Sequence, residues 1–268
     1  MQSQIWTSTI PLYIRHSSSE TPYLIAVPRL SYLPLLLPRL TSFFGPASSF
    51  SYQDILLKNL PVGLLYDLYQ PELPWQLDLG DGPLFDIHDT YINSVKEADF
   101  IRNGTAKGIM SMSKENSTQL WNAWALHSLA LFRYAQSSTV LTSLSDDLAS
   151  FRKVHNLLLR PASPLKHIPL RIYIPSTPPT SHSPSDHGSF KIVQTLIAPR
   201  HQNREIQTLG SALNTLLPSL FPSRRDAILA EPILHGAPVP FRAPLEELMR
   251  EAAYADGWLH LTVVMIDA

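Results

Sequence analysis

Two short segments near the start of the chain have the patterns of β-strands, and the first of them alternates between apolar and polar residues. Residues 5–14 end in such an alternation, which predicts a β-strand, and residues 22–28 predict a second strand bounded by prolines. The polar residues 16–20 between them predict a hairpin loop. Residues 32–44 are apolar enough for a helix, which two internal prolines would make irregular.

Two more segments complete a predicted N-terminal unit. Residues 61–69 place apolar side chains at a helical spacing, and the proline at the start is tolerated in a first turn. Residues 73–79 alternate as a strand does, with the tryptophan and two leucines on one face. The order strand, strand, helix, strand is typical of a small α+β domain in which a helix packs on an antiparallel or mixed sheet. The Gly-Asp-Gly-Pro run at 80–83 predicts a turn at a domain boundary.

The periodicity becomes helical in the middle of the chain. Asp89 is suited to cap a helix whose apolar stripe includes Tyr91 and Val95, and Asn103-Gly104 is suited to end it. No convincing strand pattern occurs in this block, so it predicts a helix-rich module. Three helices are predicted, at residues 89–103, 118–134 and 146–159.

The last third of the chain repeats the order of the first. Residues 176–188 are rich in proline, serine and threonine and lack large apolar side chains, so they predict an exposed loop. The pattern therefore predicts two α+β domains that flank a helical block. In this third we expect strands at residues 169–175, 189–198, 228–235 and 258–266, and helices at 208–217 and 244–254.

Composition excludes several classes of protein. With 21 basic and 22 acidic residues among 268, the net charge is −1, which argues against nucleic-acid binding by bulk charge. The lack of cysteine excludes disulfide scaffolds, thiolate metal sites and cysteine catalysis, and fits a reducing compartment. The first residues do not have the pattern of a signal peptide, and the most apolar window, 23–44, contains two arginines and three prolines. We therefore expect a cytoplasmic protein without a spanning helix.

The sequence offers no common catalytic or metal-binding motif. It contains no phosphate-binding glycine loop, no Gly-x-Ser-x-Gly elbow and no His-Glu-x-x-His zinc helix. His182 and His187 fall in the proline-rich and serine-rich loop, where nothing would hold a metal geometry. His260 alternates with leucines in the last predicted strand, so we expect it at the surface or at a sheet edge rather than as a base. The chain is therefore expected to have no active site, cofactor or metal of its own.

Without a catalytic motif, the remaining candidate features are exposed side chains and grooves on the surface. Lys96 is one of seven lysines, and it follows Val95 of the apolar stripe, so it points about 100° away from that stripe, toward the flank or solvent. From this pattern alone an ordinary solvated lysine is the simplest interpretation. Several small domains with many short apolar segments also leave grooves between them, and such grooves commonly accept an amphipathic helix.

Nine short segments, taken in their order along the chain, point to a known protein family. They are Pro22-Tyr-Leu-Ile-Ala-Val-Pro-Arg-Leu-Ser-Tyr32, Pro61-Val-Gly-Leu-Leu-Tyr-Asp-Leu68, Leu73-Pro-Trp75, Val95-Lys-Glu-Ala-Asp99, Gln119-Leu-Trp121, Ile168-Pro-Leu-Arg-Ile-Tyr173, Thr208-Leu-Gly210, His235-Gly236 and Trp258-Leu-His260. Together they resemble the autophagy protein five family over residues 5–266. The resemblance implies an α+β fold in which two ubiquitin-like β-grasp domains, at 4–80 and 167–268, flank a helix-rich domain at 84–161.

The resemblance also implies a function. Lys96 would be the acceptor, through an isopeptide bond, for the ubiquitin-like modifier autophagy protein twelve, with autophagy protein seven as activating enzyme and autophagy protein ten as conjugating enzyme. The conjugate would bind the coiled coil of autophagy protein sixteen. It would then act like a ligase, promoting transfer of autophagy protein eight from its conjugating enzyme, autophagy protein three, to phosphatidylethanolamine. Such a scaffold would be cytoplasmic and peripheral at the preautophagosomal membrane, and it would bind no nucleic acid.

The alternative is a non-covalent adaptor with two ubiquitin-like domains, and Lys96 in its local motif separates the two hypotheses. An amine must lose its proton before it attacks a thioester, and free lysine has a pKa of about 10.4. The incoming enzyme must therefore desolvate or deprotonate the amine. Arginine could not replace lysine, because its guanidinium stays protonated.

Overall fold

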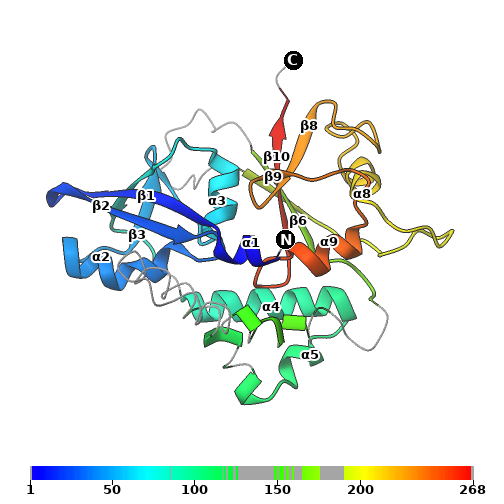
Figure 1. Cartoon of the computed structure of the whole chain (residues 1–268), viewed down its shortest axis with the longest axis horizontal. Coiled ribbons are helices and arrows are strands. Elements are labelled where there is room, and N and C mark those ends of the chain that lie inside the picture. Colours follow the sequence, from blue (N-terminus) through cyan, green and yellow to red (C-terminus); the bar gives the residue numbers. More distant parts are fainter. Residues whose placement is uncertain are drawn as a thin grey trace.

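Two five-stranded sheets and a layer of helices make up the part of the chain that the structure describes (Figure 1). One sheet comes from the first third of the chain and the other from the last third, and helix α4 (Ile87–Asn103) runs along the lower side of both in the view shown. The computed structural model describes residues 2–84, 86–116, 165–175 and 190–266, together with 118, 120–122, 125, 148–149, 151–153, 155–156 and 159.

The N-terminal sheet has the strand order β2-β1-β5-β3-β4. Its central strands β1 and β5 run parallel, and every other neighbouring pair runs antiparallel. In β5, Trp75, Leu77 and Leu79 are buried while the residues between them are more exposed, which confirms the predicted face. The strands are β1 (Thr9–His16), β2 (Ser19–Pro28), β3 (Ser49–Tyr52), β4 (Ile55–Leu56) and β5 (Trp75–Gly80).

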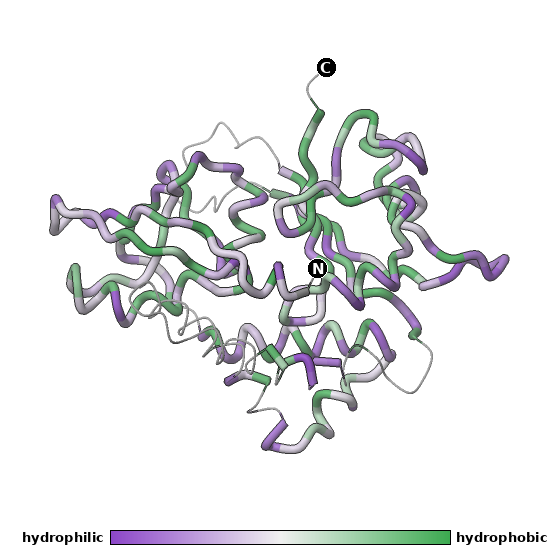
Figure 2. The backbone as a smooth tube through the Cα atoms, in the orientation of Figure 1, coloured by the Kyte–Doolittle hydropathy of each residue, from purple (hydrophilic) through white to green (hydrophobic). Residues whose placement is uncertain are grey.

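The C-terminal sheet repeats this topology. Its order β7-β6-β10-β8-β9 is the first order with each strand replaced by its counterpart, and its central strands β6 and β10 also run parallel. Figure 2 shows hydrophobic residues along β10 and hydrophilic residues on the outlying loop near residues 200–205. The elements are β6 (Leu170–Pro175), β7 (Phe190–Gln194), α8 (Leu209–Leu216), β8 (Ala230–Leu234), β9 (Ala237–Pro238), α9 (Leu245–Ala252) and β10 (Leu259–Met265).

Both sheets therefore have the β-grasp arrangement, and the predicted α+β fold with two such domains is confirmed. The predicted irregular helix at 32–44 is a 3-10 turn, η1 (Leu33–Leu36), followed by α2 (Leu37–Phe44). Helix α3 (Val62–Tyr69) lies between two hydrophobic cores. Its Val62 and Leu65 belong to the core of the N-terminal sheet, whereas Leu64 and Leu68 belong to a larger core that includes the C-terminal domain and α4.

A buried ion pair of the first β-grasp domain lies where that domain contacts the second. Arg29, which follows β2, pairs with Asp67 of α3, and both side chains are almost wholly buried. The Arg29 guanidinium also lies near Gly236, in the turn between β8 and β9. At that glycine φ is 81°, so the turn requires a conformation that other residues rarely adopt. The domains are therefore held together by polar contacts as well as by the shared core.

Several expectations need correction. The strand predicted from residue 5 begins only at Thr9, because residues 2–7 form helix α1 (Gln2–Thr7), whose Trp6 is buried in the larger core. Strands β3, β4 and β9 were not predicted, since they are too short for an alternation to stand out. Most of the helices predicted at 118–134 and 146–159, and the loop predicted at 176–188, lie outside the described residues.

Candidate functional site

Helix α4, which carries Lys96, begins and ends at residues suited to helix ends. Oδ1 of Asp86 accepts a hydrogen bond from the backbone N–H of Asp89 at 2.9 Å, so Asp86 rather than Asp89 is the N-cap. Asp89 instead occupies the first turn, where a negative charge is favourable. Gly104 ends the helix in the left-handed region with φ of 69°, as predicted.

Lys96 lies exposed on α4, next to two buried residues. Val95 and Ala98 are 1% and 0% exposed, so the lysine points away from the apolar stripe, as the pattern predicts. Residues three and four positions apart are neighbours on a helix surface. Asn93 and Phe100, at these distances from Lys96, are both exposed. The surface around Lys96 on α4 is therefore accessible and includes an aromatic side chain.

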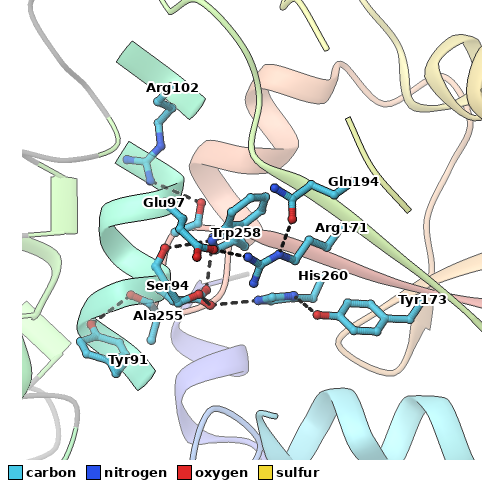
Figure 3. A network of polar contacts seen from close by, with 12 residues as sticks. Tyr91, Ser94, Glu97, Arg102, Arg171, Tyr173, Gln194, Ala255, Trp258 and His260 are labelled. Carbon is cyan, nitrogen blue, oxygen red and sulfur yellow. Dashed lines mark hydrogen bonds and ion pairs between the residues drawn. The ribbon is translucent and has the colours of Figure 1, made fainter. Parts of the chain in front are cut away.

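The opposite side of α4 is bound to the loop that precedes β10 (Figure 3). The hydroxyl of Tyr91 donates to the carbonyl of Ala255 at 3.1 Å, and Ser94 Oγ donates to Asp256 Oδ2 at 2.7 Å. In return, the indole N–H of Trp258 donates to the carbonyl of Ser94 at 2.9 Å. Tyr91 and Ser94 are three positions apart, so they lie on the same face of the helix. Their contacts fix that face against the C-terminal domain.

A fourth contact lies six residues beyond Lys96, in the last turns of α4. Arg102 is fully buried, and its Nη2 lies 3.5 Å from the carbonyl oxygen of Gly257. A side chain at Gly257 would place Cβ only 2.4 Å from that nitrogen, and φ there is 83°, so this close approach needs glycine. Burial lowers the pKa of Arg102 to about 10, although nearby Asp99 and Asp256 favour its charged form.

Arg171 on β6 links the same helix to the sheet. Its Nη2 lies 2.5 Å from Glu97 Oε2, and its Nε donates to Gln194 Oε1 at 2.9 Å. The guanidinium carbon lies 3.8 Å from the centroid of the Trp258 ring, a close cation–π contact. Glu97 directly follows Lys96, so this cluster binds α4 beside the lysine (Figure 3).

His260 is not at the surface or at a sheet edge, which corrects the sequence-based expectation. It is 2% exposed in the central strand β10, where its Nε2 lies 3.0 Å from Asp256 Oδ2 and its Nδ1 lies 3.0 Å from the hydroxyl of Tyr173. Burial opposes the charge of Asp256, but His260 and the hydrogen bonds to this carboxylate outweigh it and lower the pKa to about 2. All three side chains are buried, so we interpret them as structural; a general base must reach its substrate.

Asp99, the second acid of the Lys96 motif, is bound on another side of the helix. It is 1% exposed, and its carboxylate accepts hydrogen bonds from Asn103 Nδ2 at 2.7 Å and from the N–H of Ile109 at 3.0 Å. Ile109 belongs to α5 (Lys107–Met110), so Asp99 holds the short helix that follows α4. Both acids of the motif, Glu97 and Asp99, therefore form contacts that hold α4 and α5 in place.

The second feature of interest is an apolar groove. It has a volume of about 570 Å³ and lies between α1, the β8–β9 turn and α9. Apolar side chains from all three parts of the chain line it, so one face of a helix could bury apolar residues there. The apolar lining includes Ile5, Leu234, Val239, Ala243, Leu248 and Ala252.

The described part of the chain carries neither a metal-binding cluster nor a membrane-spanning helix. No group of three or more histidine, cysteine, aspartate or glutamate side chains there could hold a metal ion. None of the described helices is both long enough and apolar enough to cross a membrane.

Two β-grasp domains on either side of a helix-rich region define a class of proteins with tandem ubiquitin-like domains. Comparison with protein-family models identifies the family. "Autophagy protein ATG5, UblA domain" matches residues 5–80, the "alpha-helical bundle region" matches 86–142, and the "UblB domain" matches 167–263. This chain belongs to the autophagy protein 5 family.

Individual relatives agree with this assignment. "Autophagy protein 5" of Sclerotinia sclerotiorum is 62% identical, and the match covers 100% of both chains. "Autophagy protein 5" of Chaetomium globosum is 56% identical over 98% of this chain and 88% of that protein. The crystal structure of Kluyveromyces marxianus Atg5 has a TM-score of 0.71 at 20% identity, covering 98% of each chain, which shows that the fold is shared.

Sequence patterns did not find the residues that hold α4. Arg171 and Asp256 form its main polar contacts, yet each stands alone in the sequence without a motif of known spacing. The only sequence signal was indirect, because Arg171 and Trp258 fall within segments that carry the family resemblance.

Proposed function

We propose that Lys96 accepts the ubiquitin-like modifier autophagy protein twelve and that the conjugate acts as a ligase-like scaffold in autophagosome formation. The conjugate would promote transfer of autophagy protein eight to phosphatidylethanolamine. The observation that carries this proposal is an exposed lysine on a helix whose adjoining turns are bound to the second ubiquitin-like domain. Membership in the autophagy protein 5 family supports the autophagy role.

The chemistry requires only an accessible amine from this chain. The lone pair of Lys96 Nζ attacks the carbonyl carbon of the thioester that links the modifier to autophagy protein ten. The new C–N bond forms, the C–S bond breaks, the cysteine leaves as a thiolate, and the nitrogen loses its proton to solvent. Because the thioester supplies the activated carbonyl, this chain needs no catalytic site or cofactor. An exposed position suits the reaction, since two other proteins must reach it.

The apolar groove supports a second part of the proposal. An amphipathic helix can place one apolar face in a groove of this kind. We therefore propose that the coiled-coil partner, autophagy protein sixteen, binds between α1 and the second ubiquitin-like domain. Autophagy protein three would be a transient partner of the conjugate. The protein would then act in the cytoplasm and peripherally at the preautophagosomal membrane, without binding nucleic acid.

Reconstitution with purified components tests this function. The chain is incubated with autophagy proteins seven, ten and twelve and ATP, and a digest is searched by mass spectrometry for a branched isopeptide at every lysine. We expect the branch at Lys96. A stable complex with autophagy protein sixteen and no branched peptide would favour the non-covalent adaptor instead. The seven lysines are Lys58, Lys96, Lys107, Lys114, Lys153, Lys166 and Lys191.

A further inference from the structure

We propose that Glu97, Arg171 and Trp258 form a positioning element that sets the direction in which Lys96 points. This inference rests on the proposed function of Lys96 as an acceptor. Glu97 lies on α4, Arg171 on β6 and Trp258 directly before β10, so they connect the acceptor helix to β6 and to the entry of β10 in the second ubiquitin-like domain. We name them the acceptor clamp.

The first argument is that Arg171 itself is fixed from three directions. Gln194 on β7 accepts from its Nε at 2.9 Å, Glu97 binds its Nη2 at 2.5 Å, and the Trp258 ring lies 3.8 Å from its guanidinium carbon. A planar guanidinium held by two hydrogen bonds and one ring face has little freedom to rotate. The side chain of Arg171 is only 18% exposed, so solvent competes weakly for it.

The second argument is the order of contacts along α4. Ser94 is bound to Asp256 and Trp258, Lys96 follows two residues later, and Glu97 is bound to Arg171. Adjacent residues of a helix are related by a fixed rotation of about 100°. Fixing Glu97 therefore also fixes the direction of the Cα–Cβ bond of Lys96.

The third argument separates positioning from stability. The Glu97 side chain is 58% exposed, and an ion pair with one such partner contributes little to folding. Tyr91 and Ser94 attach the preceding part of α4 to the domain, whereas Glu97 makes the contact beside Lys96 itself. A contact that adds little stability yet restricts the residue beside the acceptor matters chiefly for geometry, on which group transfer depends steeply.

Single-turnover transfer from a preformed thioester of autophagy proteins ten and twelve tests the clamp. Glu97→Ala and Arg171→Ala are each expected to lower the rate at saturating acceptor about tenfold or more, with a smaller change in the half-saturating concentration. The double variant should be no slower than the slower single variant, because both changes break one interaction. Additive losses would overturn the proposal, since they would mean two independent roles.

A conservative variant distinguishes the clamp from a direct enzyme contact. Glu97→Gln keeps an oxygen that can accept from Arg171, so it should retain most of the transfer rate. A loss as large as that of Glu97→Ala would mean that the negative charge itself contacts the incoming enzyme, which would overturn positioning. Glu20→Ala, at an exposed residue of β2, is the matched control and should transfer normally.

A measurement without enzymes keeps this inference separate from the proposed function. The chain has no cysteine, so Lys96→Cys and Glu247→Cys together carry the only two thiols for nitroxide labels. Glu247 is exposed on α9 of the second domain. Pulsed electron–electron double resonance measures the distance between the two nitroxide labels. We expect a narrow distribution of this distance, which should broaden when Glu97→Ala is added. An unchanged distribution overturns the clamp, whereas a missing Lys96 conjugate in the parent chain overturns the proposed function.

Discussion

Asp67 and Gly236 are 169 residues apart in the sequence, and Oδ2 of Asp67 accepts a hydrogen bond from the N–H of Gly236 at 2.8 Å. The other carboxylate oxygen of Asp67 pairs with Arg29. Burial raises the pKa of Asp67, while Arg29 and the Gly236 N–H favour its charged form. One carboxylate therefore ties α3 of the first ubiquitin-like domain to the β8–β9 turn of the second.

Removing this carboxylate should destabilise the protein strongly. We expect Asp67→Ala to lower the free energy of unfolding by about 3–5 kcal/mol, because Arg29 is then left buried without its partner. The matched control is Asp78→Ala, which breaks the Arg15–Asp78 pair, where the side chains are 52% and 44% exposed. That change should cost at most about 1 kcal/mol. Urea unfolding measures both, and equal losses would contradict the role of Asp67.

Acid should destabilise the fold through His235 and His155, whose charged forms the protein surroundings disfavour. Burial lowers the pKa of His235 to about 3 from an ordinary 6.5, so the native state binds fewer protons than the unfolded state between these values. The contribution of the neutral His235 to the free energy of unfolding is fully present above pH 6.5 and is lost as the pH falls toward 3. His155, whose pKa burial also lowers to about 3, acts in the same direction.

His235→Asn tests this origin of acid sensitivity. Asparagine tolerates the left-handed backbone at this position, where φ is 52°, and it does not titrate. We expect the dependence of the unfolding free energy on pH to become shallower by up to about 1.4 kcal/mol per pH unit between the two pKa values. Thermal or urea unfolding across a pH series gives this slope. A slope identical to that of the parent would show that His235 does not contribute.

Lys96→Arg should separate conjugation from folding. Arginine keeps the charge and a similar helix propensity, so the stability should change by no more than about 0.5 kcal/mol. The conjugate should nevertheless be lost, and with it efficient lipidation of autophagy protein eight, while coiled-coil binding persists. Lys107→Arg, at an exposed residue of α5, is the control and should conjugate normally. Immunoblots of starved cells that carry each variant provide the measurement, and a conjugate band of normal intensity in Lys96→Arg would exclude it as the acceptor.

The apolar groove should bind its partner by burial rather than by charge. Leu248→Glu places a carboxylate in the groove lining and should weaken binding of the coiled-coil partner at least about tenfold, or about 1.4 kcal/mol. Leu24→Glu, at a residue that is 66% exposed on β2, is the control and should bind normally. Isothermal titration calorimetry gives the dissociation constant of the coiled-coil partner for each variant, and equal constants for the two variants would contradict binding in the groove.

Salt gives a second test of the groove. Apolar burial is not screened as exposed charges are, so the complex should survive between about 0.1 and 0.5 M salt. Dissociation over this range would indicate an electrostatic surface instead.

Local periodicity was enough to predict most of the elements. The alternation at residues 73–79 became β5, and the helical spacings at 61–69 and 244–254 became α3 and α9. The orientation of Lys96 and the end of its helix at Gly104 were also predictable. These features depend on residues within one or two turns of each other, which a sequence displays directly.

What covers each element was decided only by the tertiary structure. In β10 one face carries Leu259 and Leu261 and the other carries His260 and Thr262, and an alternation of this kind predicts one buried face and one solvated face. Both faces are buried, because α3 of the first domain packs against β10 and Asp256 satisfies His260. The periodicity of apolar residues indicates only which residues are buried within their own domain. The contact of a second domain, like the pairing of Glu97 with Arg171, joins residues too far apart in sequence for any local pattern to register.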